Sequence, residues 1–176
     1  MSTTSPEEPP CLATPSSLLK ADHKVIREVF RQFETLGESA HAEQGRLVDK
    51  MLELLTVHTY IENECMYPRT RELVPDLEDD VLESYEEHHV ADVLCVELST
   101  MSPGDERFGA KTTVLIENVT HHMQEEEQDW FPKVREALGR KQLQEIGAEM
   151  LKLKKSAPRR PSQPSALKKA LDALLD

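Results

Sequence analysis

The stretch HTYIENE, residues 58–64, decides the fold, because it places ionisable side chains directly after an apolar run with the spacing of a helix interior. His58 and Glu62 are four residues apart, so a helix carries both on one face, roughly 6 Å from each other. Such groups are costly to bury unless something pairs with them. The stretch therefore predicts a helix whose buried face binds a partner, with other helices completing the site.

Apolar residues at intervals of three and four predict three more long helices around this one. The four expected helices run from Ser16 to about Gly37, from about Ala42 to Tyr67, from VPDLEDD (74–80) to the turn MSPGDE (101–106), and from that turn to Pro132. Pro68 and Pro132 are expected to end their helices, because proline removes a backbone donor and clashes with the preceding turn. Short connections between long helices favour an all-α fold, an antiparallel up-down four-helix bundle.

The composition of the chain outside these helices predicts its domain organisation. The expected parts are a disordered leader (1–15), the four-helix bundle (16–138), a short C-terminal helical extension (139–153), and a proline-rich linker with a short amphipathic tail (154–176). The tail sequence ALKKALDALLD is weakly amphipathic, and we expect it to dock on the bundle, to fray, or to bind a partner.

Charge and cysteine usage exclude several classes of partner. Lys and Arg total 21 against 33 Asp and Glu among 176 residues, so the net charge is -12 and nucleic acid or an acidic membrane would be repelled. The three cysteines are widely spaced, and no stretch resembles a secretory signal or approaches the roughly 18 apolar residues of a membrane span. We therefore expect a soluble, cytoplasmic protein with reduced thiols.

Each expected helix carries a histidine on its apolar face, and these are His23, His58, His88 and His122. One such histidine is usually a core residue, but four in four helices indicate a common partner. Glu62 and Glu126 follow His58 and His122 by four residues, a spacing that lets both groups bind one metal ion or bridge two. Six ligands suit two ions, with the glutamates bridging. Imidazoles and carboxylates without thiolates favour iron or manganese over structural zinc.

Neighbouring residues leave several assignments open. His89 competes with His88 because its own stripe is partly apolar, whereas the stripe through His121 is mainly polar and favours His122 as the ligand. Asp92 repeats the four-residue spacing after His88 and is a further candidate ligand or a solvated carboxylate. Tyr85 lies one turn before His88 and is the candidate catalytic residue, as a ligand, a hydrogen-bond donor beside the ligands, or part of the core.

Together these motifs resemble the haemerythrin-like (HHE cation-binding) domains over roughly residues 16–138. The resemblance lies in LLKADHKVIREVF (18–30), HTYIENECMYP (58–68), EEHHVADVL (86–94) and HHMQEEEQDWFP (121–132). It implies an antiparallel four-helix bundle that holds two non-haem iron ions with an oxo or hydroxo bridge. The ligands that it implies are His23, His58, Glu62, His88, His122 and Glu126.

The sequence departs from the oxygen-carrying haemerythrins at Asp92, where those proteins have a second histidine, and in the shorter spacing from His122 to Glu126. The loss of an imidazole favours redox chemistry over reversible O2 carriage. The chain is similar to peroxide-consuming haemerythrin-like proteins of actinobacteria, which implies a reaction with H2O2, O2 or NO, most concretely catalase-like peroxide breakdown in oxidative stress. The alternatives are an iron or oxygen sensor or store without enzymatic activity, and a nitric oxide response or iron-centre repair protein.

Overall fold

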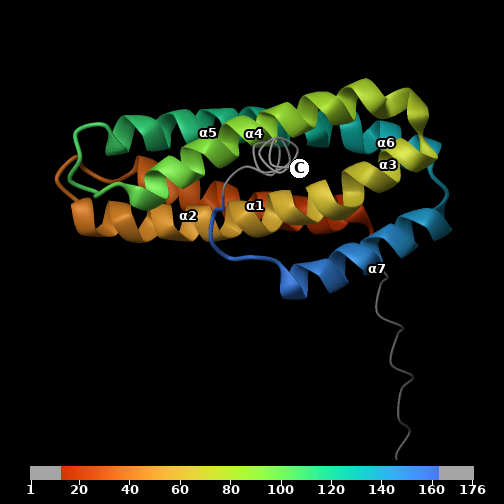
Figure 1. Ribbon diagram of the computed structural model, residues 1–176, viewed down its shortest axis with the longest axis horizontal. Helices are drawn as coiled ribbons and strands as arrows, with labels where there is room; N and C mark the ends of the chain where they lie inside the picture. Colours follow the sequence, from red (N-terminus) through yellow and green to blue (C-terminus); the bar gives the residue numbers. More distant parts are fainter. Residues whose placement is uncertain (1–12, 163–176) are drawn as a thin grey trace, which may run out of the picture.

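Four long helices lie side by side in the computed structural model, which describes residues 13–162 (Figure 1). In chain order the elements are α1 Pro15–Glu34, α2 His41–Ile61, the π-helical turn η1 Glu62–Met66, α3 Tyr67–Leu73, the 3-10 turn η2 Pro75–Leu77, α4 Glu78–Thr100, α5 Phe108–Glu125, the π-helical turn η3 Glu126–Trp130, α6 Phe131–Ala137 and α7 Arg140–Ser156. Because α2, η1 and α3 follow one another without a break, as do α5, η3 and α6, the bundle has four helices and α7 is a fifth.

The predicted antiparallel bundle is confirmed, and its first helix begins one residue before the expected Ser16. Thr14 caps this end through two reciprocal hydrogen bonds. The Ser17 backbone N–H donates to the Thr14 hydroxyl, and the Thr14 backbone N–H donates to the Ser17 hydroxyl. Pro15 occupies the first turn, where a missing backbone donor costs nothing. The cap therefore fixes where α1 starts.

Pro68 and Pro132 do not end their helices, so that prediction was wrong. Each proline follows a π-helical turn, in which the backbone N–H of residue i bonds to the carbonyl of residue i−5. The Tyr67 N–H donates to the Glu62 carbonyl, and Pro68 has no N–H to donate to the next carbonyl, that of Asn63. The Tyr85 hydroxyl donates to this carbonyl instead, at 3.3 Å. The wider turn thus accommodates a residue that would break an α-helix.

A polar layer divides the core of the bundle in two. One apolar cluster lies towards the α1–α2 and α4–α5 connections and includes Phe30, Leu55 and Val119. The other lies towards the opposite end, against α7, and includes Leu19, Ile61 and Val134. The four predicted histidines lie between these clusters along their helices, so apolar packing on both sides fixes the position of the layer.

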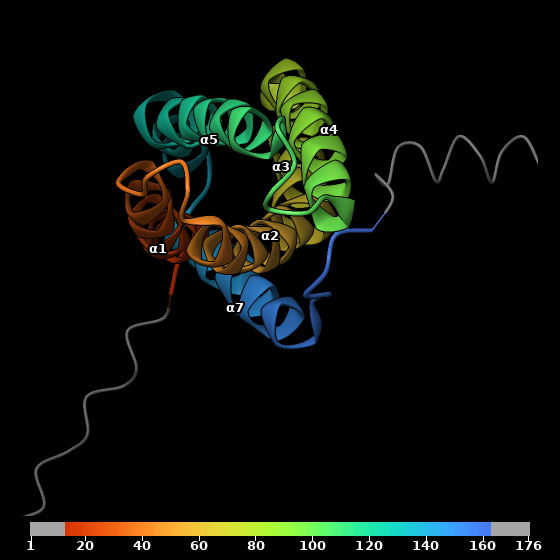
Figure 2. The ribbon, with the colours of Figure 1, turned by 90° about the vertical axis from the view of Figure 1, so that its left-hand side faces the viewer.

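Helix α7 lies outside the ring of four helices, against α1 and α2 (Figure 2). It buries Leu143, Ile146 and Met150 on the bundle. Gly147 approaches the start of α1 so closely that a Cβ there would lie 2.0 Å from the Ala13 carbonyl oxygen. The contact therefore needs glycine, and it holds the predicted helical extension in a defined place.

Two of the sequence predictions concern segments beyond residues 13–162. Most of the predicted leader (1–15) and the amphipathic tail (166–176) lie outside the described residues, so docking of the tail and its binding of a partner stay predictions. Within the described range, no helix has the length and apolar character needed to cross a bilayer.

Candidate metal centre

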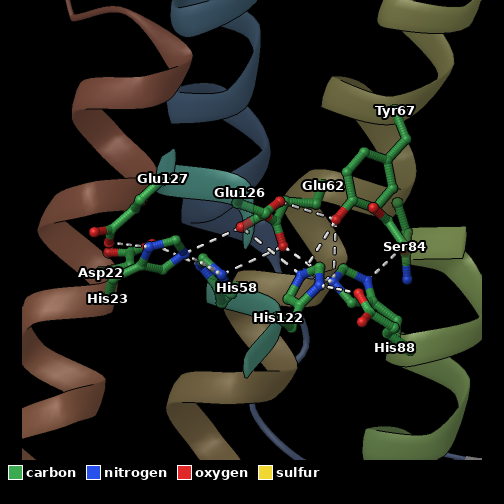
Figure 3. A network of polar contacts seen from close by, with 12 residues as sticks. Asp22, His23, His58, Glu62, Tyr67, Ser84, His88, His122, Glu126 and Glu127 are labelled. Carbon is green, nitrogen blue, oxygen red and sulfur yellow. Dashed lines mark hydrogen bonds and ion pairs between the residues drawn. The ribbon is translucent and has the colours of Figure 1, made fainter. Parts of the chain in front are cut away.

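The four histidines point their Nε2 atoms towards the centre of the bundle and form two pairs (Figure 3). In the first pair the Nε2 atoms of His23 and His58 are 3.2 Å apart. In the second the Nε2 atoms of His88 and His122 are 3.0 Å apart. We call these the His23–His58 half and the His88–His122 half. Each half takes one histidine from each of two neighbouring helices, α1 and α2 or α4 and α5.

Two buried glutamates lie between the halves, and each faces one histidine of both. The Glu62 Oε2 atom is 3.3 Å from the His58 Nε2 and 3.4 Å from the His88 Nε2. The Glu126 Oε2 atom is 3.3 Å from the His23 Nε2 and 3.7 Å from the His122 Nε2. Within each of two groups the potential ligand atoms lie within 4.8 Å of one another, and these groups are His23, His58, Glu62 and Glu126, and Glu62, His88 and His122. Each glutamate therefore belongs to the surroundings of both histidine pairs.

Three of the histidines bind an outer acceptor through their Nδ1 atom. The three Nδ1 contacts are His23 with Glu127 at 2.7 Å, His88 with Asn63 at 2.8 Å, and His122 with Glu87 at 2.6 Å. The Nδ1 of His58 faces the Asp22 carboxylate at 3.6 Å, and Asp22 also binds Lys154 of α7. Acceptors at these positions favour the proton on Nδ1, which leaves the Nε2 lone pairs directed inwards.

The centre fits a cation because its inward-facing atoms repel one another without one. Opposed Nε2 lone pairs at 3.0–3.2 Å and two buried carboxylates concentrate electron density in the interior of the bundle. Both oxygens of Glu62 and the Oε2 of Glu126 have no hydrogen-bond partner among the described residues. A positive ion at each half would satisfy these atoms, whereas an apolar or anionic ligand would not.

The same crowding perturbs the titration of the cluster. Burial and the neighbouring Glu126 raise the pKa of Glu62 well above its usual range. Burial opposes ionisation of Glu126 as well, but the imidazoles of His122, His23 and His58 lower its pKa to about 2. Burial and the proximity of His122 hold the pKa of His88 well below its ordinary value. Burial likewise lowers the pKa of His58, so His58 and His88 favour the neutral form that a ligand needs. Burial acts in the same direction on His122, but Glu126 and Glu87 outweigh it and raise the pKa of that imidazole.

Tyr67 is the phenol of the cluster, a role for which the sequence had suggested Tyr85. Its hydroxyl donates to Glu126 Oε1 at 3.1 Å and lies 3.2 Å from the His88 Nε2. Burial and the two glutamates raise the pKa of Tyr67 well above its usual value, so the hydroxyl keeps its proton. Tyr85 packs edge-on against the Tyr67 ring and binds the Asn63 backbone, outside both ligand groups. In the sequence, the one sign of the π-helical turn that directs Tyr67 inwards is Pro68, a proline within a continuing helical pattern.

His89, Asp92 and His121 lie outside the two buried ligand groups. His88 is 3% exposed and lies in the cluster, whereas His89 is only partly buried and belongs to neither buried group. Asp92 is partly buried beside His89, and burial raises its pKa to about 6. His121 is on the surface, 3.2 Å from Glu125. The preferred residue of each histidine pair is therefore the one that faces the centre.

The two halves are related by equivalent positions in their sequences. His58, Glu62, Tyr67 and Pro68 have the same spacing as His122, Glu126, Phe131 and Pro132. The outer acceptors correspond as well, because Asp22 and Glu87 directly precede His23 and His88, and Asn63 and Glu127 directly follow the two glutamates. Phe131 stacks on His23 with ring centroids 5.9 Å apart, as Tyr67 packs on His88 at 5.3 Å. The centre is thus built twice from one arrangement of residues.

Comparison with known proteins identifies the family. The Hemerythrin HHE cation binding domain matches residues 14–134, and the chain belongs to this family. The resemblance found in the sequence is confirmed, and the molecule is a haemerythrin-like cation-binding bundle with buried His and Glu candidates for a metal site.

Two similar proteins give this family assignment a structural and a sequence context. A solved structure of a Hemerythrin HHE cation binding domain-containing protein from Mycobacterium kansasii has a TM-score of 0.67 and 21% identity, covering 82% of this chain and 89% of that one. A protein described as a DNA nickase from Nostoc sp. (strain PCC 7120 / SAG 25.82 / UTEX 2576) is 24% identical over 132 residues. That alignment covers 75% of this chain but only 36% of the relative, so the chain spans about a third of the relative's length.

Proposed function

We propose that the protein is a non-haem di-iron protein that reacts with hydrogen peroxide, O2 or NO, and that its most concrete activity is catalase-like breakdown of peroxide. The observation that carries this proposal is the position of Glu62 and Glu126, each of which faces one histidine of both halves. One ion would leave two histidines without a partner, whereas two ions would use all six residues. His23, His58, His88, His122, Glu62 and Glu126 would hold the ions.

The chemistry of these residues supports iron. Cys65 and Cys95 are buried away from both groups, and burial raises the pKa of the Cys65 thiol to about 12. Imidazole and carboxylate ligands without thiolate suit iron or manganese. When bound, two iron ions would accept two electrons from the peroxide molecule that is oxidised and return two electrons to the one that is reduced.

The protein must also move protons during this reaction, because two H2O2 become two H2O and one O2. Two protons leave the peroxide molecule that is oxidised and two enter the molecule that is reduced. Tyr67 holds a proton at the cluster, and its hydroxyl lies 3.1 Å from Glu126 Oε1. We infer that Tyr67 donates this proton and recovers it, with Glu126 as its partner.

Metal analysis together with peroxide turnover tests the proposal. Protein purified with iron should contain two irons per chain, absorb in the near ultraviolet as a ferric cluster, and release O2 from H2O2. The matched control is His58→Ala, which should lose iron and turnover together. Two irons without O2 release, but with a rapid spectral change on adding NO, would favour the nitric oxide response instead.

The description of the Nostoc relative raises DNA cleavage as a second candidate. The net charge of -12 argues against it, because a polyanion is repelled by an excess of carboxylates. Incubation of the iron-loaded protein with supercoiled plasmid tests this candidate. Conversion to the open circular form, absent with His58→Ala, would support cleavage, and intact plasmid would exclude it.

A further inference from the structure

A pocket of about 310 Å³ opens between α4 and the α5–η3 segment and reaches the metal centre. His122 and Glu126 lie in its wall, and the Oε2 of Glu126 is one of the buried atoms that have no partner among the described residues. The pocket therefore connects solvent with the His88–His122 half.

Carboxylates dominate the wall of this pocket. Six of its lining residues are acidic, and these are Asp80, Glu83, Glu87, Glu125, Glu126 and Asp129. Lys133 lies nearby and pairs with Asp80 at 3.3 Å and Asp129 at 2.7 Å, so the rim carries a counter-charge there. Within the described range, neither Lys nor Arg lines the pocket itself. A concave surface of one charge raises the local concentration of cations.

The equivalent place on the other half is closed. By the correspondence of the two halves, Asp80, Glu83 and Ser84 have Pro15, Leu18 and Leu19 as their counterparts. Similarly, Glu125, Asp129 and Trp130 have Ile61, Cys65 and Met66 as theirs.

Helix α7 covers this apolar counterpart. Its buried residues Leu143, Ile146 and Met150 share one cluster with Leu19, Ile61, Cys65 and Met66. The sequence is thus apolar where a helix closes the centre and acidic where the centre stays open. The open side of one half and the covered side of the other thus differ at equivalent positions. This difference is a second observation beside the acidic composition of the pocket, and it indicates that the opening is functional.

A third group of potential ligand atoms lies at the wall of the pocket, which Glu87 and Glu125 line. Glu87, His121 and Glu125 each offer an atom, and these atoms lie within 4.8 Å of one another. Glu87 also binds the His122 Nδ1 at 2.6 Å, so this outer group touches a residue of the buried centre. His121 is 67% exposed and Glu125 is 52% exposed, which suits rapid binding and release and not permanent retention.

We propose that this acidic pocket is the entrance through which divalent iron reaches the centre, and that Glu87, His121 and Glu125 form a transient site for the ion on its way. The inference rests on the proposed metal centre and adds the direction from which it is loaded. The ion would meet the His88–His122 half first. The His23–His58 half, behind α7, would be filled from within, across the shared glutamates.

Metal uptake by the metal-free protein tests this inference without measuring peroxide turnover. The probe is Co²⁺ alone, followed by stopped-flow absorbance, and the variant is Glu83→Gln/Glu125→Gln. The matched control is Glu86→Gln/Glu117→Gln, which removes the same charge from exposed positions of α4 and α5 that do not line the pocket. We expect uptake by the pocket variant to be about 5–10-fold slower at low salt, with the difference shrinking as salt rises. The final stoichiometry should stay at two ions, and the control should match the unmodified protein.

Each result decides between distinct conclusions. A second variant, His121→Asn, should slow uptake without changing the melting temperature of the metal-free protein, and normal uptake would overturn the transient site.

If the pocket variant loads as fast as the unmodified protein, or if the control slows equally, the entrance is elsewhere and only this inference fails. If the unmodified protein binds no Co²⁺, both the metal centre and its entrance are wrong. Normal loading without peroxide breakdown would refute only the proposed reaction.

Discussion

The His23–His58 half and the His88–His122 half use equivalent positions in their helices but have different surroundings. Beside the first half lies Phe131, which has no hydroxyl, and beside the second lies Tyr67, whose hydroxyl donates to Glu126. The first is covered by α7, and the second opens to the acidic pocket. In the function that we propose, both halves would hold ions, whereas ion entry and proton transfer would use only the His88–His122 half.

The outer acceptors follow the same division. In the His23–His58 half, both outer carboxylates form an ion pair with a cationic side chain. Arg27 binds Glu127 at 2.8 Å, and Lys154 binds Asp22. In the second half Asn63 is uncharged, and the ion-pair partner of Glu87 within residues 13–162 is His122 itself. The outer carboxylates of the His23–His58 half are therefore neutralised by cations, whereas Glu87 of the His88–His122 half has no Lys or Arg partner within residues 13–162.

The largest effect is expected from removing a shared ligand. Glu62→Ala should lower iron content towards zero and reduce the melting temperature of iron-loaded protein by about 10 °C, because a ligand at 1,000 times its Kd adds about 4 kcal/mol. His58→Ala should affect the first half more than the second. Metal analysis and calorimetry measure both effects. Glu117→Ala, at an exposed position of α5, is the surface control and should leave both quantities unchanged. Two irons retained in Glu62→Ala would refute the bridging role.

Making the halves alike should remove turnover while keeping the ions. Tyr67→Phe gives the second half the ring of the first, and we expect peroxide breakdown to fall about 100-fold with iron content unchanged. Tyr85→Phe is the matched control, since its hydroxyl binds only backbone. Initial rates of O2 release per bound iron are the measurement. Equal rates in Tyr67→Phe and the unmodified protein would show that the phenol has no part in proton transfer.

Loosening α7 at one contact should weaken the closed half selectively. Lys154→Met removes the cation that holds Asp22 towards His58, and we expect one of the two ions to bind about 10-fold more weakly. Lys155→Met, an exposed neighbour, is the control. Competition with a chelator measures the two affinities separately. Equal weakening of both ions would mean that Lys154 acts on the stability of the whole bundle.

The smallest effect concerns Asp92, which the sequence had offered as a ligand. Burial raises its pKa from 3.8 to about 6, so the folded state binds the proton more tightly than the unfolded state. Stability therefore falls as pH rises through this window, and the loss persists above it. Asp92→Asn should stabilise metal-free protein by about 1 kcal/mol at pH 7.5 and by little at pH 4, allowing for partial exposure of the side chain. Urea unfolding at both values checks this, and a gain independent of pH would contradict it.

Helical spacing predicted most of this centre, because an i, i+4 pair stays on one face wherever the helix is regular. It identified the four buried histidines and two glutamates, and it preferred His88 and His122 over their neighbours, as their burial shows. Helical spacing did not identify Tyr67, because the π-helical turn before it changes which side chains face the centre of the bundle. The outer acceptors Asp22, Asn63 and Glu87 were also missed, because contacts between distant helices leave no periodic signal. The packing of α7 on the His23–His58 half also depends on contacts between helices that are distant in the sequence, so helical spacing could not predict it.

The shared glutamates have a consequence for how the chain unfolds. The helices α1 and α2 form one hairpin, and α4 and α5 form another, each with two of the histidines. Glu62 reaches from the first hairpin to His88 of the second, and Glu126 reaches back to His23. Bound ions would thus act as a removable crosslink between two hairpins that also share both apolar clusters of the core. The two hairpins could not separate without releasing ions, so metal loading should make their unfolding more strongly coupled.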